Sequence, residues 1–266
     1  MPSERVLESR QLIIDTFKSF RSKLLDSYGV FEFERKDNFS PVTECDEEIE
    51  VVLKAKLAEE FPELGFKGEE TGQDGEMDSY WIVDPIDGTS SFIRGMPNCT
   101  NMAAYVDGDD VICSVIYDFV NDILYTAIKG GGAFRDGKQI FVNDYNRKFE
   151  VNMHGREVFS RISNLFMSQD LRPHQPIGAI GRALVLLSEG QMDGWLQLSG
   201  YGKEYDFAPG VLLATEAGAK IVVLDDIEKP FSIHEVYRDF FIGTEATANL
   251  ISQNIDEIRS IRKKAI

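Results

Sequence analysis

Two aspartates three residues apart, Asp84 and Asp87, are the side chains best spaced to bind a metal ion. They lie in the segment 84–89, Asp-Pro-Ile-Asp-Gly-Thr, which follows a short apolar run. Proline has no N–H and fixes φ, so Pro85 is expected to take the chain out of a strand, and Gly88 permits it to turn back. Two carboxylates across such a turn can converge on one cation.

The other ligands that this segment offers are also oxygen atoms. The carbonyl of Ile86 falls between the two carboxylates and can point the same way. Carboxylate, carbonyl and hydroxyl oxygens favour Mg²⁺ over zinc. Thr89 and Ser90 add hydroxyls and backbone N–H groups, which would bind a phosphate if a helix begins here. The alternative interpretation is a common surface turn.

Three more acidic segments could serve the same site. Glu69 belongs to the segment 68–71, Gly-Glu-Glu-Thr, and Asp46 ends the segment 36–46 in the first turn of a predicted helix. Asp206 begins another predicted helix, where the helix dipole favours an acid. Each acid alone has an ordinary explanation as a loop residue, a helix cap or a dipole partner.

Apolar spacing and turn residues predict the elements that position these acids. Residues 4–28 carry apolar side chains at helical spacing, and a second helix is expected from Thr43 to about Phe61. Strands are expected at 80–83, 100–107, 111–118 and 122–129. The last three are predicted to form an antiparallel meander, and Asp136 with Gly137 marks a further hairpin.

The second half alternates helices with short strands. Helices are predicted at 178–190 and 206–217, strands at 220–224 and 240–242, and Thr244 is expected to cap a final helix.

We therefore predict two parts. Residues 1–145 form an α+β half with the antiparallel sheet and most metal ligands, and residues 146–266 form an α/β half that supplies Asp206 and the substrate-selecting residues.

The composition is globular, but the charge is unusual. The 266 residues are 43% hydrophobic and carry 45 acidic against 28 basic side chains, a net charge of −17. Such a surface repels nucleic acids and anionic membranes, so we expect neither as a partner. It would also repel a phosphorylated metabolite unless a cation lies in the site, which bound Mg²⁺ would provide.

The cysteines and the apolar runs indicate a compartment. Cys45, Cys99 and Cys113 show no paired spacing, which suits small buried thiols in a reducing environment. The first residues lack a signal pattern, and no apolar run approaches the ~20 residues that span a bilayer. We therefore expect a cytoplasmic protein.

Together, the four acidic segments resemble the successive signatures of the inositol monophosphatase-like family. The matching blocks are 36–46, 68–71, 84–89 and the sequence Asp-x-Ala-x-Gly from Asp206, in the family's order and spacing. The resemblance implies a layered αβαβα sandwich, a homodimer, lithium sensitivity, and two or three Mg²⁺ ions in each active site.

Carried over by position, the resemblance assigns the metal ligands. A first Mg²⁺ would be held by Glu69, Asp84 and the Ile86 carbonyl. A second would be held by Asp87 and Asp206 and would share Asp84 with the first. Two such cations would neutralise the nonbridging phosphate oxygens and lower the pKa of a bound water.

The resemblance also implies roles around the phosphate. Asp46 and Glu69 lie where the family supports a weaker third ion or its waters. The N–H groups of Gly88 and Thr89 would bind the phosphate, next to Ser90. Thr89, linked to Glu69, would position the attacking water and help to deprotonate it.

The segment that should choose the substrate departs from the family pattern. Tyr205 stands where the family usually has Trp, and Gln197 stands near the position of a Glu that holds the sugar in inositol-specific members. Asp206, besides binding metal, would contact the substrate. Arg182 and Lys203 could bind a second acidic group or lie in solvent, which is favoured for Lys203.

The sequence therefore predicts a Mg²⁺-dependent phosphomonoesterase that hydrolyses a small phosphorylated metabolite similar to inositol monophosphate. Alternative substrates are histidinol phosphate, 3′(2′),5′-bisphosphate nucleotides and fructose 1,6-bisphosphate. Another alternative is a catalytically silent regulatory relative. Such a protein would be expected to have lost metal-binding carboxylates, which are all present here.

Overall fold

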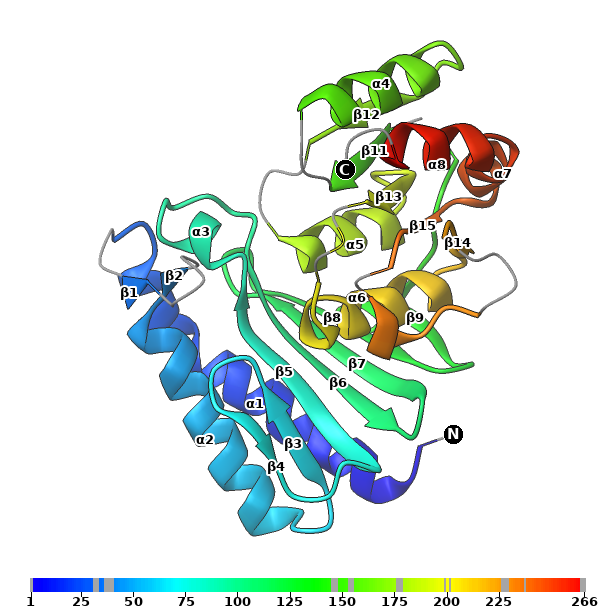
Figure 1. Ribbon diagram of the computed structural model, residues 1–266. Coiled ribbons are helices and arrows are strands. Elements are labelled where there is room, and N and C mark those ends of the chain that lie inside the picture. The colour runs from blue at the N-terminus through cyan, green and yellow to red at the C-terminus, as the bar shows by residue number, and fades with distance from the viewer. Residues whose placement is uncertain are drawn as a thin grey trace.

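The described part of the chain forms a layered structure in which two large sheets alternate with layers of helices, and a small two-stranded sheet lies apart from them (Figure 1). The structure is a computed structural model. The residues that it describes are 2–30, 34–35, 41–144, 148–152, 156–175, 179–198, 200, 202–225, 230–236 and 238–263. The predicted segment 36–46 is therefore described only from residue 41 onward.

The larger sheet has eight strands among the described residues, in the order β10-β9-β8-β7-β6-β5-β3-β4. The strands are β3 (Gly65–Gly68), β4 (Gly72–Asp74), β5 (Ser79–Asp87), β6 (Thr100–Asp107), β7 (Asp110–Asp118), β8 (Ile123–Ile128), β9 (Gly132–Arg135) and β10 (Lys138–Ile140). Neighbours are antiparallel except β3 and β5, which run parallel. Parallel strands end at the same edge of a sheet, so the ends of β3 and β5 lie together.

A second sheet, with five strands in the described part of the chain, has the order β12-β11-β13-β15-β14. Its strands are β11 (Lys148–Asn152), β12 (Arg172–His174), β13 (Gly194–Gln197), β14 (Lys220–Val223) and β15 (Phe240–Gly243). The short strands β1 (Glu34–Arg35) and β2 (Pro41–Val42) pair separately. The helices are α1 (Glu4–Ser27), α2 (Glu44–Glu60), α3 (Thr89–Phe92), α4 (Arg156–Met167), α5 (Ile180–Ser188), α6 (Glu204–Glu216), η1 (Ile233–Glu235), α7 (Glu245–Gln253) and α8 (Ile255–Lys263).

The alternating side chains of β5 show how the first layers pack. Trp81 and Val83 are buried against α1 and α2, whereas Tyr80 and Ile82 are buried against α5 and α6. Successive strand residues point to opposite faces, so one strand contributes to two apolar cores. A sheet covered on both faces reads as a continuous apolar run, as residues 80–83 do.

The second sheet completes the layers. Trp195 and Ile242 join the core with α5 and α6, and Leu196 and Phe241 face α4, α7 and α8. The order is therefore helices, sheet, helices, sheet, helices, visible from bottom to top in Figure 1. This confirms the predicted αβαβα sandwich. The predicted division between residues 145 and 146 stays a prediction. The helices α5 and α6, which follow it in sequence, pack on the first sheet.

Most predicted elements agree with the structure. The helices α1 and α2, the meander β6–β8 and the Asp136–Gly137 hairpin are confirmed, the last with φ of +46° and +77°. The predicted final helix is two helices that meet at Asn254. The strands β3, β4, β11, β12 and β13 and the helix α4 were not predicted.

One expectation about Pro85 is wrong. The strand β5 does not end there but continues to Asp87, with a one-residue shift in its pairing with β6 between Asp84 and Asp87. A β-bulge accommodates proline because the extra residue needs no ladder hydrogen bond. The buried Asn101 Nδ2 donates to the Pro85 carbonyl over 2.5 Å, which satisfies the acceptor left at the bulge.

Two further expectations concern burial and membranes. All three cysteines lie in the described chain, and each is a buried free thiol, as predicted. No helix in the described part of the chain is long and apolar enough to cross a membrane.

A buried hydrogen bond joins the first helix to β5. The indole Nε1 of Trp81 donates to Ser9 Oγ over 3.0 Å, and Ser9 Oγ donates to the Val6 carbonyl. Both side chains are fully buried. This contact fixes α1 on the strand that carries Asp84 and Asp87.

We expect Ser9→Ala to lower the free energy of unfolding by about 1–3 kcal/mol, because the buried Trp81 N–H loses its acceptor. Ser19→Ala is the matched control, since Ser19 Oγ also donates to a carbonyl three residues back but belongs to an exposed residue. The control should cost under about 0.5 kcal/mol. Urea unfolding curves measure both, and equal losses would show that the Trp81 contact contributes nothing.

Candidate active site

The candidate site lies at the edge of the first sheet where β3 and β5 end. Gly68 pairs with Val83, and the N–H of Glu69 donates to the Val83 carbonyl over 3.2 Å. Glu69 is therefore the first residue beyond β3, next to the strand position that precedes Asp84. The parallel pairing of these two strands brings together acids that are 15 residues apart in sequence.

Asp84 is the centre of this group of acids. Its side chain is 2% exposed, and its Oδ1 atom is buried without a hydrogen-bond partner. Burial raises its pKa well above the usual range, and nearby negative charges raise it further. In decreasing order of effect these charges belong to Glu69, Asp87, Asp206 and Asp46. The structure thus brings all five predicted acids close enough to repel one another.

Asp87 is also buried, but one of its oxygens is occupied. Its Oδ2 accepts the Gly181 N–H over 2.7 Å, and the backbone N–H of Arg182 adds a second hydrogen bond. Burial, followed by the charge of Asp206, raises the pKa of Asp87. A Cβ on Gly181 would lie 2.6 Å from Oδ2, so only glycine lets the start of α5 approach this closely. The sequence analysis did not identify Gly181, and no local pattern marks it.

Asp46 and Asp206 occupy the same position, the third residue, of two helices. Asp46 Oδ2 accepts hydrogen bonds from Thr43 N and Thr43 Oγ1, over 2.8 and 2.5 Å, and Asp206 Oδ2 accepts one from Lys203 N over 2.8 Å. Each carboxylate therefore uses one oxygen to cap its helix. The positive ends of the two helix dipoles also favour these acids.

Thr89 has two hydrogen-bond acceptors that were not predicted. Its Oγ1 lies 3.0 Å from the Ile86 carbonyl and 3.4 Å from Asp46 Oδ1. The second contact connects the start of α2 with the segment 84–89. The first involves the carbonyl that was predicted to bind metal.

A short helix does begin at the predicted phosphate site. Gly88 caps α3 with φ of +86°, and a Cβ there would lie 2.6 Å from the Asn98 carbonyl. The first N–H groups of a helix have no partner within it, so those of Thr89 and Ser90 are available to a ligand. The Ser90 side chain is exposed.

The acids are close but not yet arranged as ligands. Among the described residues, no three acidic, histidine or cysteine side chains form a group that could hold a metal ion as they stand. Like charges in a poorly solvated site repel, so a tight arrangement needs a cation. The unpartnered Asp84 Oδ1 and an all-oxygen donor set fit a hard cation such as Mg²⁺.

The predicted substrate contacts lie apart from the acids or have protein partners. Gln197 is fully buried in β13, where its Oε1 accepts from Asn152 Nδ2 and Trp195 Nε1 over 2.9 and 3.2 Å. The contact of Gln197 with the substrate stays a prediction, and these two hydrogen bonds do not favour it. The Arg182 guanidinium lies 3.5 Å from the buried Asp118. The side chain of Lys203 is exposed, as expected.

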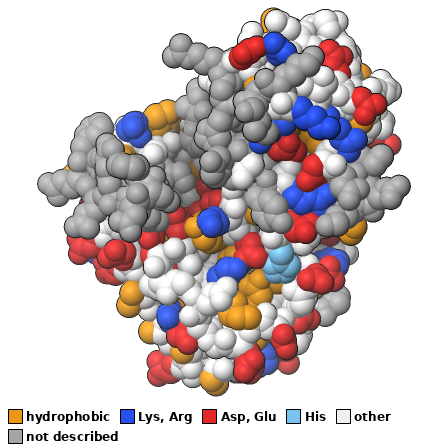
Figure 2. Space-filling view, in the orientation of Figure 1, with side chains coloured by type: hydrophobic (Ala, Val, Ile, Leu, Met, Phe, Trp, Pro, Cys, Tyr) orange, Lys and Arg blue, Asp and Glu red, His pale blue; other side chains and the backbone are white. Residues whose placement is uncertain are grey.

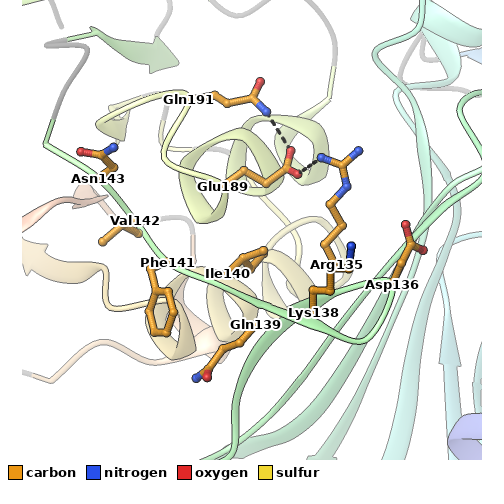
Figure 3. A pocket seen from close by; sticks show the side chains of 10 residues that line it. All are labelled: Arg135, Asp136, Lys138, Gln139, Ile140, Phe141, Val142, Asn143, Glu189 and Gln191. Atoms are coloured by element: carbon orange, nitrogen blue, oxygen red, sulfur yellow. Dashed lines mark hydrogen bonds and ion pairs between the residues drawn. The ribbon is translucent and has the colours of Figure 1, made fainter.

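A pocket of about 820 Å³ lies elsewhere, beside the β9–β10 hairpin and the end of α5 (Figure 3). Figure 3 shows Glu189 paired with Arg135, at 2.5 Å, and with Gln191. None of the predicted site residues lines this pocket. The acids that line it are Asp136 and Glu189, and Glu189 is paired with Arg135, so the pocket holds no group of carboxylates comparable to that around Asp84.

Acidic side chains also lie on the outer surface. Figure 2 shows acidic side chains spread over one face and interspersed with basic ones, in a chain with a net charge of −17. Among the acids at the site, Asp46, Asp84 and Asp87 are buried, which strengthens the repulsion between their charges, whereas Glu69 and Asp206 are partly exposed.

Comparisons with known proteins agree with this fold. Residues 9–252 match the inositol monophosphatase family. The chain is 32% identical over 209 residues to inositol monophosphatase 1 of Solanum lycopersicum, covering 72% of this chain and 74% of that one. It is 28% identical over 215 residues to fructose-1,6-bisphosphatase of Pyrococcus furiosus, covering 80% and 83%. An IMPase structure from Thermotoga maritima superposes with a TM-score of 0.83 at 22% identity, covering 96% and 99%.

The chain belongs to the inositol monophosphatase family. The family consists of phosphoric monoester hydrolases that act on small phosphorylated substrates and in general depend on Mg²⁺. The relatives carry different substrate names, so membership defines the reaction and leaves the substrate open.

The pKa of Asp46 predicts how the metal-free protein responds to pH. Burial raises it from 3.8 to about 7, outweighing the hydrogen bonds from Thr43. A carboxyl that is protonated more readily when folded stabilises the fold at low pH, and this stabilisation is lost as pH rises to the folded pKa. Between about pH 4 and 7 the loss approaches roughly 1.4 kcal/mol per pH unit.

We therefore expect the melting temperature of the wild type in chelator to fall from pH 5 to pH 8. Asp46→Asn should show a shallower fall, because its side chain does not titrate. Differential scanning fluorimetry at several pH values measures both profiles. Parallel profiles would contradict the assignment to Asp46.

Proposed function

We propose that this protein is a Mg²⁺-dependent phosphatase of small metabolites, with an inositol monophosphate-like compound as its first-choice substrate. The observation that carries the proposal is the buried, unpartnered Oδ1 of Asp84 among four other acids. In its charged form such a group is stable only if cations balance its charge.

The residues present fit two metal ions. Glu69, Asp84 and the Ile86 carbonyl would hold one, and Asp84, Asp87 and Asp206 would hold the other, with Asp46 near a weaker third. Bound Mg²⁺ would neutralise phosphate charge and activate water as a Lewis acid. The hydrogen bond from the Gly181 N–H to Asp87 Oδ2 supports this role, since it fixes one oxygen and orients the other.

The chain's own groups would then orient the substrate and move a proton. The N–H groups of Gly88, Thr89 and Ser90 would bind phosphate oxygens at the start of α3. Thr89 Oγ1 shares its one proton between the Ile86 carbonyl and Asp46 Oδ1, and it keeps a lone pair with which it can accept a hydrogen bond from the attacking water. Glu69 would help Thr89 to orient this water.

The finer features remain parts of this proposal. Lithium sensitivity and a homodimer are implied by the resemblance, and a cytoplasmic location suits the free cysteines. Histidinol phosphate, bisphosphate nucleotides and fructose 1,6-bisphosphate are the alternative substrates, the last supported by the relative from Pyrococcus furiosus. A silent regulatory role is disfavoured because the acids Glu69, Asp84, Asp87 and Asp206 are all present.

We expect Asp87→Asn to reduce the rate of Mg²⁺-dependent phosphate release by more than roughly 100-fold. Loss of a residue that only hydrogen-bonds to a metal ligand typically costs roughly 10–100-fold, and Asp87 is proposed to be a ligand itself. The asparagine keeps the shape but removes the charge that binds the cation. Asp15→Asn, an exposed change on α1, is the control and should leave the rate unchanged. Absence of Mg²⁺-dependent activity in the wild type, or full activity in Asp87→Asn, would overturn the proposed function.

The substrate is tested by a phosphate-release panel with the four candidates, each with Mg²⁺ and again with added Li⁺. We expect inositol monophosphate to have the highest kcat/KM and Li⁺ to inhibit. Much faster turnover of another candidate would replace the first-choice substrate and keep the mechanism.

A further inference from the structure

We propose that Glu50 is a positioning residue for the active site, which holds the turn 68–71 so that Glu69 faces Asp84. The proposal rests on the proposed function, because it gives Glu69 a role in metal binding. Glu50 lies on α2 and belongs to none of the four acidic segments that the sequence analysis singled out.

Glu50 accepts three hydrogen bonds from this turn. Its Oε1 accepts from Glu70 N over 2.8 Å, and its Oε2 accepts from Thr71 N over 2.8 Å and from Thr71 Oγ1 over 2.9 Å. The side chain is fully buried. Hydrogen bonds to a carboxylate are stronger than neutral ones, and buried groups of this kind are costly to disrupt.

The turn is held closely on both sides of Glu69. A Cβ on Gly68 would lie 2.1 Å from Glu50 Oε2, so the glycine lets the carboxylate reach under the turn. On the other side, the N–H of Glu69 is bonded to the Val83 carbonyl of β5. The backbone of Glu69 is therefore fixed between the carboxylate on α2 and the strand that carries Asp84.

The same helix positions a second part of the site. Asp46 and Glu50 are four residues apart on α2, so they lie on one face of the helix. Asp46 contacts Thr89 in the segment 84–89, and Glu50 holds the turn 68–71. The helix α2 packs into the core through Leu53 and Leu57. It thereby sets the distance between the turn 68–71 and the segment 84–89.

The chemistry of the contact requires a carboxylate rather than an amide. Both oxygens of Glu50 accept N–H groups, so glutamine would place its NH₂ against either Glu70 N or Thr71 N. Glu50→Gln keeps the volume and one acceptor. It should therefore loosen the turn without opening a cavity.

We expect Glu50→Gln to raise the Mg²⁺ concentration for half-maximal phosphate release by roughly 10–100-fold, which is typical for loss of a residue that orients a metal ligand. The value of kcat at saturating Mg²⁺ should fall less, because the ligands themselves remain. The Mg²⁺ concentration that raises the melting temperature should shift in parallel. In metal-free protein, amide hydrogen exchange at Glu70 and Thr71 should accelerate.

Two controls separate positioning from general stability. Glu48→Gln makes the same change on the same helix at a partly exposed side chain that pairs with Lys23, and should leave the Mg²⁺ dependence unchanged. Leu57→Ala removes buried volume from α2 and should lower the melting temperature by at least as much as Glu50→Gln. It should not move the Mg²⁺ dependence.

Two results would overturn the inference. One is a folded Glu50→Gln protein with the wild-type Mg²⁺ dependence and exchange rates, and the other is an equal shift of the Mg²⁺ dependence in Leu57→Ala.

Glu69→Gln distinguishes failure of this inference from failure of the proposed function. If Glu69→Gln weakens the Mg²⁺ response and Glu50→Gln does not, only the inference is wrong. If the wild type shows no Mg²⁺ response, the proposed function is wrong, and the role of Glu50 in it falls as well.

Discussion

The repulsion between the buried Asp84 and the acids around it is the constraint on which the rest of the structure depends. A carboxylate that is 2% exposed, with one oxygen unpartnered, raises the free energy of the fold unless its charge is neutralised. Protonation achieves this at low pH, and a bound cation would achieve it at neutral pH. The family's general dependence on Mg²⁺ is consistent with the second.

The layers around the site reduce this repulsion with backbone groups. The helices α2, α5 and α6 all begin at the site, so the positive ends of their dipoles face the acids. Asp46 and Asp206 cap their own helices, and Asp87 accepts from the start of α5. Few basic side chains are needed near the acids, which leaves room for an anionic substrate and its metal ions.

Features fixed by short stretches of sequence were predictable, and features fixed by packing were not. The helices α1 and α2 and the strand β6 follow from apolar periodicity, and the capping position of Asp46 follows from the spacing from Thr43. The path of the chain at Pro85 was predicted wrongly, because proline by itself indicates a strand end. A bulge opposite Asn101 tolerates it, and that partner lies 16 residues away.

The sequence by itself determined which oxygen ligands exist, in what order, and that a glycine at residue 88 allows a turn before a short helix. These properties depend on residues within a few positions of one another. Only the tertiary structure decided that β3 pairs parallel to β5, that Gly181 admits Asp87, and that Glu50 reaches the turn beside Glu69. Those contacts join distant parts of the chain, and local periodicity carries no information about which distant partners meet.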